Sequence, residues 1–540
     1  MKIKPFCWIL FYPCVLLSCN NNRSSTKKVF RYNEATNIAT LDPAFAKNQS
    51  IIWAVHQLYN TLVETDSALQ IAPSLARSWT VSADRLVYRF QLRTDVVFHD
   101  DVAFDGGKGR KMTARDVVYS FKRIIDPATA SSGAWIFNNR IDSLHPFVAV
   151  NDSVFELRLA RPFAPVLGLL SMTYCSVVPQ EVVSMHGKDF GRHPSGTGPF
   201  RFRFWEEGQA LVFLKNENYF QRDSSGQRLP YVDAVKVSFY NNKATEFLLF
   251  RQGKLDFIND IDASFKDEIL TKKGVLKKEW EGKIQLQKHP YLNTEYLGIL
   301  YDSTLPAVKA SPLRHKLIRQ AINYGFDREK LMMYLRNSVG TAAESGFIPA
   351  GLSAYDPLRV RGYSYNPRKA RQLLTEAGYP GGKGLPRIKL LTVPTYAELA
   401  GFIARELMNI GLVVQVDVVQ KSLLLEQTAN STALFFRASW IADYPDAENY
   451  LSVFYSKNPA PPNYTHYANK KFDILYEQAL LITDDSIRSR RYQEMDQLVM
   501  EDAPVVPLWY DQLLHLVQPG VTGFTPNGLN LLELRTVRLP

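Results

Sequence analysis

The chain has 540 residues, of which 46% are hydrophobic and 12% aromatic, and its formal net charge is +11. This length predicts two or three domains with large apolar cores rather than one small domain. The basic residues are scattered and form no Lys/Arg-rich block, which argues against a nucleic-acid-binding protein.

The N-terminus has the pattern of a secretory signal. Lys2 and Lys4 precede an apolar run over residues 6–17 that is too short to span a membrane. The following Leu16-Leu17-Ser18-Cys19 resembles the lipobox of bacterial lipoproteins, which implies a signal peptide over residues 1–18, a lipidated Cys19 and a polar tether over residues 19–28. The alternative is an ordinary signal peptide that happens to end in Cys. Cleavage before Cys19 would leave Cys175 without a disulfide partner.

Strands and helices alternate along the first half of the chain. The patterns predict a strand from Val29, a helix over residues 51–62, a strand over residues 86–92 and a helix that begins with a capping box at Thr113. Residues 101–111, DVAFDGGKGRK, are rich in Gly and charged side chains and predict an exposed loop. No strand-to-helix frame surrounds them, so they do not predict a phosphate-binding loop.

The second half predicts an α/β lobe. Ser311-Pro312 and Asn366-Pro367 each supply an N-cap and a first-turn proline for a helix. A strand over residues 388–393, a helix over 395–410 and a strand over 413–419 then form a βαβ unit. The chain crosses between lobes near His289 and, through the proline-containing segment from Ala503, crosses back, as hinge closure requires.

The residues after the next predicted strand are the candidate binding site. Leu434 to Phe436 are apolar, and Arg437, Asp443, Asp446 and Glu448 follow around a Tyr444-Pro445 turn. Ligands of open α/β sheets lie beyond the carboxyl ends of strands, so a basic and an acidic residue here can meet the two ends of a zwitterionic ligand. The alternative is a surface loop of solvated charges.

Several segments resemble one family in the same order. They are IAPSLARSWTVSADRLVYRFQLRTDVVFHD, TARDVVYSFKRIIDP, Gly196 to Phe200, Arg251 to Asp256, Leu313 to Asn323 and Trp440 to Asp446. From Val29 to Tyr510 the chain resembles the solute-binding proteins of ABC importers in the oligopeptide- and dipeptide-binding family. This implies a two-lobed α/β fold of the class II periplasmic-binding-protein (Venus-flytrap) type. Lobe I would comprise residues 29–62, 187–287 and 505–540, an extra subdomain residues 63–186, and lobe II residues 288–504.

The resemblance also implies roles for the candidate site. Asp443 would receive the amino terminus of a peptide, Arg437 would meet its carboxylate, and Ser439 and Ile441 would offer main-chain groups to it. Trp440 has the alternative role of a core residue, and Ala447 stands where the family often has Pro. Other family members bind nickel chelates, haem or sugars, so a non-peptide solute remains an alternative.

The expected partners are a short peptide and the permease subunits of an ABC importer. We expect a monomer that binds no nucleic acid and is held on the periplasmic or cell-surface side of a bacterial membrane through Cys19 alone. No nucleophile elbow, HExxH helix or paired metal-ligand spacing occurs, so no catalytic residue, metal or cofactor is predicted. An exported hydrolase with a site built from distant residues remains the alternative from another class.

Overall fold

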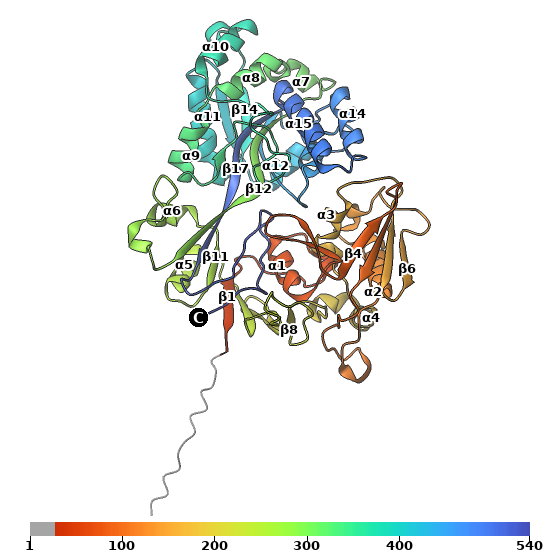
Figure 1. Cartoon of the computed structure of the whole chain (residues 1–540). Helices are drawn as coiled ribbons and strands as arrows, with labels where there is room; N and C mark the ends of the chain where they lie inside the picture. The colour runs from red at the N-terminus through yellow and green to blue at the C-terminus, as the bar shows by residue number, and fades with distance from the viewer. Residues whose placement is uncertain (1–26) are drawn as a thin grey trace, which may run out of the picture.

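The computed structural model describes residues 27–540, except for the side chains of residues 263–264. Two α/β lobes are joined by a pair of long antiparallel strands, β12 (Gln285–Ile299) and β17 (Val505–Val517) (Figure 1). The predicted signal peptide and Cys19 lie outside the described residues. No helix within the described range is both long and apolar enough to cross a membrane.

A four-stranded sheet forms the centre of the first lobe. Its order is β1 (Val29–Asn33), β10 (Ala234–Ser238), β9 (Ala210–Lys215) and β8 (Phe200–Glu206), with β1 parallel to β10 and the other pairs antiparallel. Helices α1 (Gln49–Leu58), α5 (Lys243–Arg251) and α6 (Ala263–Ile269) belong to this part of the chain. Alternate residues such as Phe30, Tyr32 and Val235 are fully buried, as the two-residue period of a strand requires.

Residues between α1 and β8 add a second unit to this lobe. It contains the hairpin β2 (Val63–Thr65) and β3 (Ile71–Pro73), the antiparallel sheet β4 (Ala76–Val81), β5 (Val87–Leu92), β7 (Val154–Arg158) and β6 (Phe147–Asn151), and helices α2 (Ala114–Ile125), α3 (Val166–Leu170) and α4 (Gln180–His186). The predicted capping box at Thr113 is confirmed, because Asp116 completes it at the start of α2. The residues of the predicted loop over 101–111 are exposed or half-buried except for Phe104, which is buried.

A seven-stranded sheet organises the second lobe. Its order is β11 (Phe257–Asn259), β17, β12, β16 (Phe435–Ile441), β14 (Ile388–Thr392) and β15 (Val414–Val418), and β13 (Thr341–Ala342) pairs with β17. The helices are α7 (Pro306–Ala310), α8 (Lys316–Tyr324), α9 (Arg328–Arg336), α10 (Pro367–Glu376), α11 (Ala397–Met408), α12 (Lys421–Ala429), α13 (Glu448–Leu451), α14 (Lys470–Ala479) and α15 (Asp485–Asp502). The predicted βαβ unit is confirmed as β14, α11 and β15, with the two strands parallel.

The two faces of this sheet bury different cores. Leu292 and Tyr296 of β12 belong to a cluster with residues of α13, α14 and α15, whereas Leu297 and Ile299 belong to a cluster with residues of α8 to α11. Successive side chains of a strand point to opposite faces, so over residues 292–299 the even-numbered residues of β12 face one cluster and the odd-numbered residues the other.

The return crossing between the lobes differs from the expectation. Ala503 ends α15 with a left-handed backbone (φ 50°), and Val505 to Trp509 are buried in the second lobe. Pro507 is tolerated in β17 because the register with β12 shifts beside it. A second irregularity lies where Pro290 opposes Gln512, so we place the crossing of β17 near residue 511 rather than at Ala503.

Candidate functional site

One edge of strand β16 is uncovered over its last residues. β16 pairs with β12 along its whole length, but with β14 only where Phe436 meets Leu391. At the two ends of the β12 pairing, Leu300 N donates to Leu434 O and Ala442 N donates to Leu292 O. Main-chain groups of an antiparallel strand alternate in direction, so those of Ser439 and Ile441 face the other edge, where no strand within residues 27–540 pairs.

Asp443 lies just beyond this edge. Its side chain is exposed, and its Oδ2 accepts a hydrogen bond of 3.4 Å from Nδ2 of Asn449, whose Oδ1 in turn accepts one of 3.2 Å from the Asp443 N–H. Loss of solvation by the surrounding protein raises the pKa of the Asp443 carboxyl, and Asn449 opposes that rise. No Lys, Arg or His of the described residues forms an ion pair with it.

The Asp443 carboxylate faces the first lobe. Burial, and to a smaller degree the negative charge of Asp443, raises the pKa of Tyr174, which lies between α3 and α4. The next residue of the loop, Tyr444, is buried in the hydrophobic cluster of the first lobe. Asp443 therefore stands where the two lobes meet.

Arg437 is already paired. Its Nε and Nη2 donate to the carboxylate of Glu295 on β12, with distances of 3.1 Å from Nε to Oε2, 2.7 Å from Nη2 to Oε1 and 2.6 Å from Nη2 to Oε2. The side chains of Arg437 and Glu295 are 15% and 3% exposed. The guanidinium lies 3.8 Å from the ring centroid of Tyr396, whose hydroxyl donates to Glu295 Oε1 at 3.2 Å. Burial raises the pKa of the Glu295 carboxyl, and the positive charge of Arg437 opposes that rise.

A second ion pair adjoins the first. Nη2 of Arg336 lies 2.7 Å from Oδ1 of Asp511, and its guanidinium lies 4.4 Å from a ring centroid of Trp509. Nδ2 of Asn293 lies 3.4 Å from Glu295 Oε1 and 3.2 Å from Asp511 Oδ2, so it links the two pairs. Asn293 and Glu295 lie on β12 and Asp511 on β17, near the crossing between the lobes, and Arg336 is the last residue of α9.

The structure places the predicted site residues along one strand end. Arg437 lies at the point where β14 leaves β16, and Asp443 lies beyond the other end of the uncovered edge. Ser439 is half-buried and Ile441 is 47% exposed. Trp440 packs on the cluster of α13 to α15, and its Nε1 donates to Asn449 Oδ1 at 3.0 Å. No cluster of three or more metal-ligating side chains was found in the described part of the chain.

Three contributors to this site escaped sequence reasoning. Glu295 had a usable signal, because a single acidic residue inside the apolar run LNTEYLGIL is buried at a cost unless it is paired. Asn449 and Tyr396 had no such signal, since their contacts with Asp443, Trp440 and Glu295 depend on how the loop and β14 are folded.

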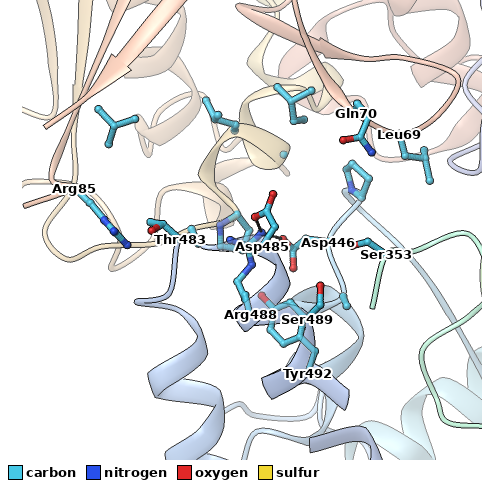
Figure 2. A pocket seen from close by; sticks show the side chains of 18 of the residues that line it. Leu69, Gln70, Arg85, Ser353, Asp446, Thr483, Asp485, Arg488, Ser489 and Tyr492 are labelled. Carbon is cyan, nitrogen blue, oxygen red and sulfur yellow. Dashed lines mark hydrogen bonds and ion pairs between the residues drawn. The ribbon is translucent and has the colours of Figure 1, made fainter. Parts of the chain in front are cut away.

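The lobes touch beyond Pro445, and residues of both line an open cavity of about 710 Å³ (Figure 2). Leu69, Gln70 and Arg85 line it from the first lobe, and Asp446, Arg488 and Tyr492 from the second. The lobes are joined here by hydrogen bonds from Arg85 Nη1 to Leu481 O, at 3.1 Å, and from Ala164 N to Leu480 O, at 3.2 Å.

Comparisons with known proteins identify the family of the chain. Residues 70–462 match the family model described as bacterial extracellular solute-binding proteins, family 5. The chain is 26% identical to heme-binding protein A of Haemophilus influenzae over 97% of both chains. It is 25% identical to glutathione-binding protein GsiB of Escherichia coli over 91% of this chain and 90% of that protein.

A solved structure shows the same fold. It is the periplasmic binding protein DppA of Helicobacter pylori in complex with the peptide STSA, with a TM-score of 0.75 and 26% identity over 95% of this chain and 98% of that chain. The two-lobed α/β fold predicted from the sequence is thereby confirmed. The chain belongs to the bacterial extracellular solute-binding proteins of family 5.

Proposed function

We propose that this solute-binding protein captures short peptides with a free amino end between its lobes and delivers them to an ABC importer. Asp443, beside the uncovered edge of β16, carries the proposal. It is an exposed carboxylate without a cationic partner among the described residues, at the end of a strand that can accept one more strand. An extended peptide would pair with Ser439 and Ile441, and its ammonium group would meet Asp443.

The length of the edge limits the ligand. Arg437 and Asp443 are six residues apart, which is roughly 20 Å in an extended chain and less where Tyr444-Pro445 turns. A peptide of about two to six residues spans that distance. We propose that Arg437 lies beside the far end of the ligand, where its pairing with Glu295 limits how it can meet a carboxylate.

The relatives leave other solutes open, because their names include heme, glutathione and peptides. A ligand without an amino group would leave Asp443 unpaired, which favours an amine. A sugar has no ammonium group, so its binding would depend little on the charge of Asp443. An exported hydrolase would shorten the peptide, so mass spectrometry of the peptide after incubation separates capture from turnover.

Calorimetry with the peptide Ser-Thr-Ser-Ala and its N-acetylated form tests the proposal. Removing the partner of a desolvated charge typically costs about 2–5 kcal/mol, so Asp443→Ala should weaken binding of the free-amine peptide by roughly 30-fold or more. Acetylation of the peptide should weaken its binding to the wild type by a similar factor and should hardly weaken its binding to the variant. Asp485→Ala removes an 82% exposed carboxylate at the nearby cavity and should leave both affinities unchanged. If acetylation weakens binding to Asp443→Ala as much as it weakens binding to the wild type, Asp443 does not hold the amine.

The proposed location is the outer side of a bacterial membrane, with Cys19 as the lipid anchor. The predicted signal peptide and the family description support export.

A further inference from the structure

The charges at the Arg437 end of the proposed ligand path are balanced. Glu295 takes three hydrogen-bond contacts from Arg437, and Asp511 takes one from Arg336. Asn293 joins the two acids. Two cations thus face two carboxylates, so this end offers no excess positive charge to a ligand.

The other end of the path is not balanced. Asp443 is hydrogen-bonded to the neutral amide of Asn449, and no cation among the described residues is paired with it. The whole path from Asp443 to Arg437 therefore carries one uncompensated negative charge. A ligand complementary to it has a net positive charge, whereas a free dipeptide or tripeptide without charged side chains has none.

A carboxylate that took Arg437 as its counter-ion would do so at the expense of Glu295. If the guanidinium turned toward the ligand, Glu295 would remain buried without its cation, which is strongly unfavourable. The Tyr396 ring also restrains the guanidinium by lying against one of its faces. The hydrogen bonds to Glu295 come from Nε and Nη2, so a neutral acceptor such as an amide carbonyl can approach Nη1 without separating the pair.

We infer that Glu295 is a specificity-determining residue. Because it compensates the charge of Arg437, it makes this protein select ligands that have an amine at Asp443 and an uncharged group at Arg437. The ligand class is then peptides with a masked carboxylate, such as an amide, or peptides whose chain continues past Arg437. This inference rests on the proposed function, because it assumes an amine on Asp443 and a chain along β16.

Binding of matched peptides tests the inference. Peptides of three to six residues, each made with a free carboxylate and as the C-terminal amide, are titrated into the full-length wild type and into Glu295→Gln. The wild type should bind the amide at least as tightly as the acid at every length. In Glu295→Gln the positive charge of Arg437 is no longer compensated. For the peptide length that ends at Arg437, the acid should therefore gain at least tenfold in affinity relative to the amide.

Two further variants keep the result interpretable. Asp417→Asn on β15 removes one negative charge, as Glu295→Gln does, but from an ion pair with Lys389. It should leave the ratio of the two dissociation constants unchanged. If Glu295→Gln does not fold, Glu295→Gln with Arg437→Met removes both charges and should bind acid and amide alike.

Each outcome decides one question. A wild type that binds the acid more tightly than the amide at the length that ends at Arg437 overturns the inference while peptide capture stands. A folded Glu295→Gln with an unchanged ratio has the same consequence. A double variant that still prefers one form by tenfold overturns it as well. A wild type that binds none of the peptides overturns the proposed function and this inference with it.

Discussion

A single side chain, that of Asn449, holds both the main-chain N–H and the carboxylate of Asp443. The same Oδ1 that accepts from Asp443 N also accepts from the indole of Trp440, so the loop and the end of β16 share one buried anchor. Asn449 thus fixes where the proposed amine partner lies.

Replacement of this anchor should weaken amine recognition without touching the ligand directly. Loss of a buried hydrogen-bonding group costs about 1–3 kcal/mol, and 1.4 kcal/mol is about tenfold in affinity. We expect Asn449→Ala to weaken binding of a free-amine peptide about tenfold and to leave binding of its N-acetylated form unchanged, by calorimetry. Asn458→Ala, which removes a hydrogen bond to Ser452 O from the same region, is the matched control. Equal losses for both peptides would show that Asn449 only supports the fold.

Gly168 of α3 lies against Tyr444, so we expect the size of its side chain to control lobe closure. A Cβ placed on Gly168 would lie 3.5 Å from Cβ of Tyr444, which is an ordinary contact, so alanine fits there but a longer side chain does not. Gly168→Leu should hold the lobes apart and weaken ligand binding at least tenfold, whereas Gly168→Ala should bind like the wild type.

Small-angle scattering checks this prediction. The radius of gyration should fall on ligand binding in the wild type and in Gly168→Ala, and should stay at the ligand-free value in Gly168→Leu. Unchanged radii in all three proteins at saturation would argue against closure of the two lobes.

The proposed membrane attachment through Cys19 gives a third prediction. One acyl chain binds a membrane only marginally, so stable attachment needs the several chains of a bacterial lipoprotein. Cys19→Ala should therefore move the folded protein to the soluble fraction after cell disruption. Cys175→Ala, at a buried cysteine without a disulfide, should leave it in the membrane fraction. Attachment that survives Cys19→Ala would place the anchor elsewhere.

Local signals in the sequence predicted much of the fold, and contacts between distant segments were missed. The N-cap of Asn366 at α10 and the capping box of Thr113 depend on residues three positions apart, so the sequence is sufficient to find them. The Arg437–Glu295 pair joins residues 142 positions apart, and nothing near Arg437 indicates that its charge is compensated. The crossing was predicted from Ala503 because the two prolines that follow it fit a rigid connecting segment. Pro507 instead lies within β17, beside a register shift.

Asp496 of α15 should make the stability of the second lobe depend on pH. It is buried, and its two oxygens accept hydrogen bonds from Phe347 N, at 2.7 Å, and Ile348 N, at 3.2 Å. Burial raises the pKa of this carboxyl to about 7, although the two N–H donors oppose the rise. The carboxyl in the unfolded chain has an ordinary pKa of about 3.9.

The sign of the effect follows from the protons bound. Between these two pKa values the folded protein binds a proton that the unfolded chain releases, so Asp496 stabilises the fold at low pH. That contribution is lost as the pH rises through about 7. The slope is at most about 1.4 kcal/mol per pH unit. Asp496→Asn lacks this contribution, so its deficit in the free energy of unfolding should be larger near pH 5 than near pH 8.

Urea unfolding of both proteins at about pH 5 and about pH 8 measures this difference. Asp223→Asn is the control. Hydrogen bonds from Tyr231 and Ser225 lower the pKa of Asp223 to about 2, so this carboxyl is ionised at both pH values. The deficit of Asp223→Asn in the free energy of unfolding should therefore be the same at both. A deficit of Asp496→Asn that does not change between the two pH values would mean that Asp496 is already ionised at about pH 5 in the folded protein, as it is in the unfolded chain. Its two hydrogen bonds to the 347–348 main chain would then account for its whole contribution.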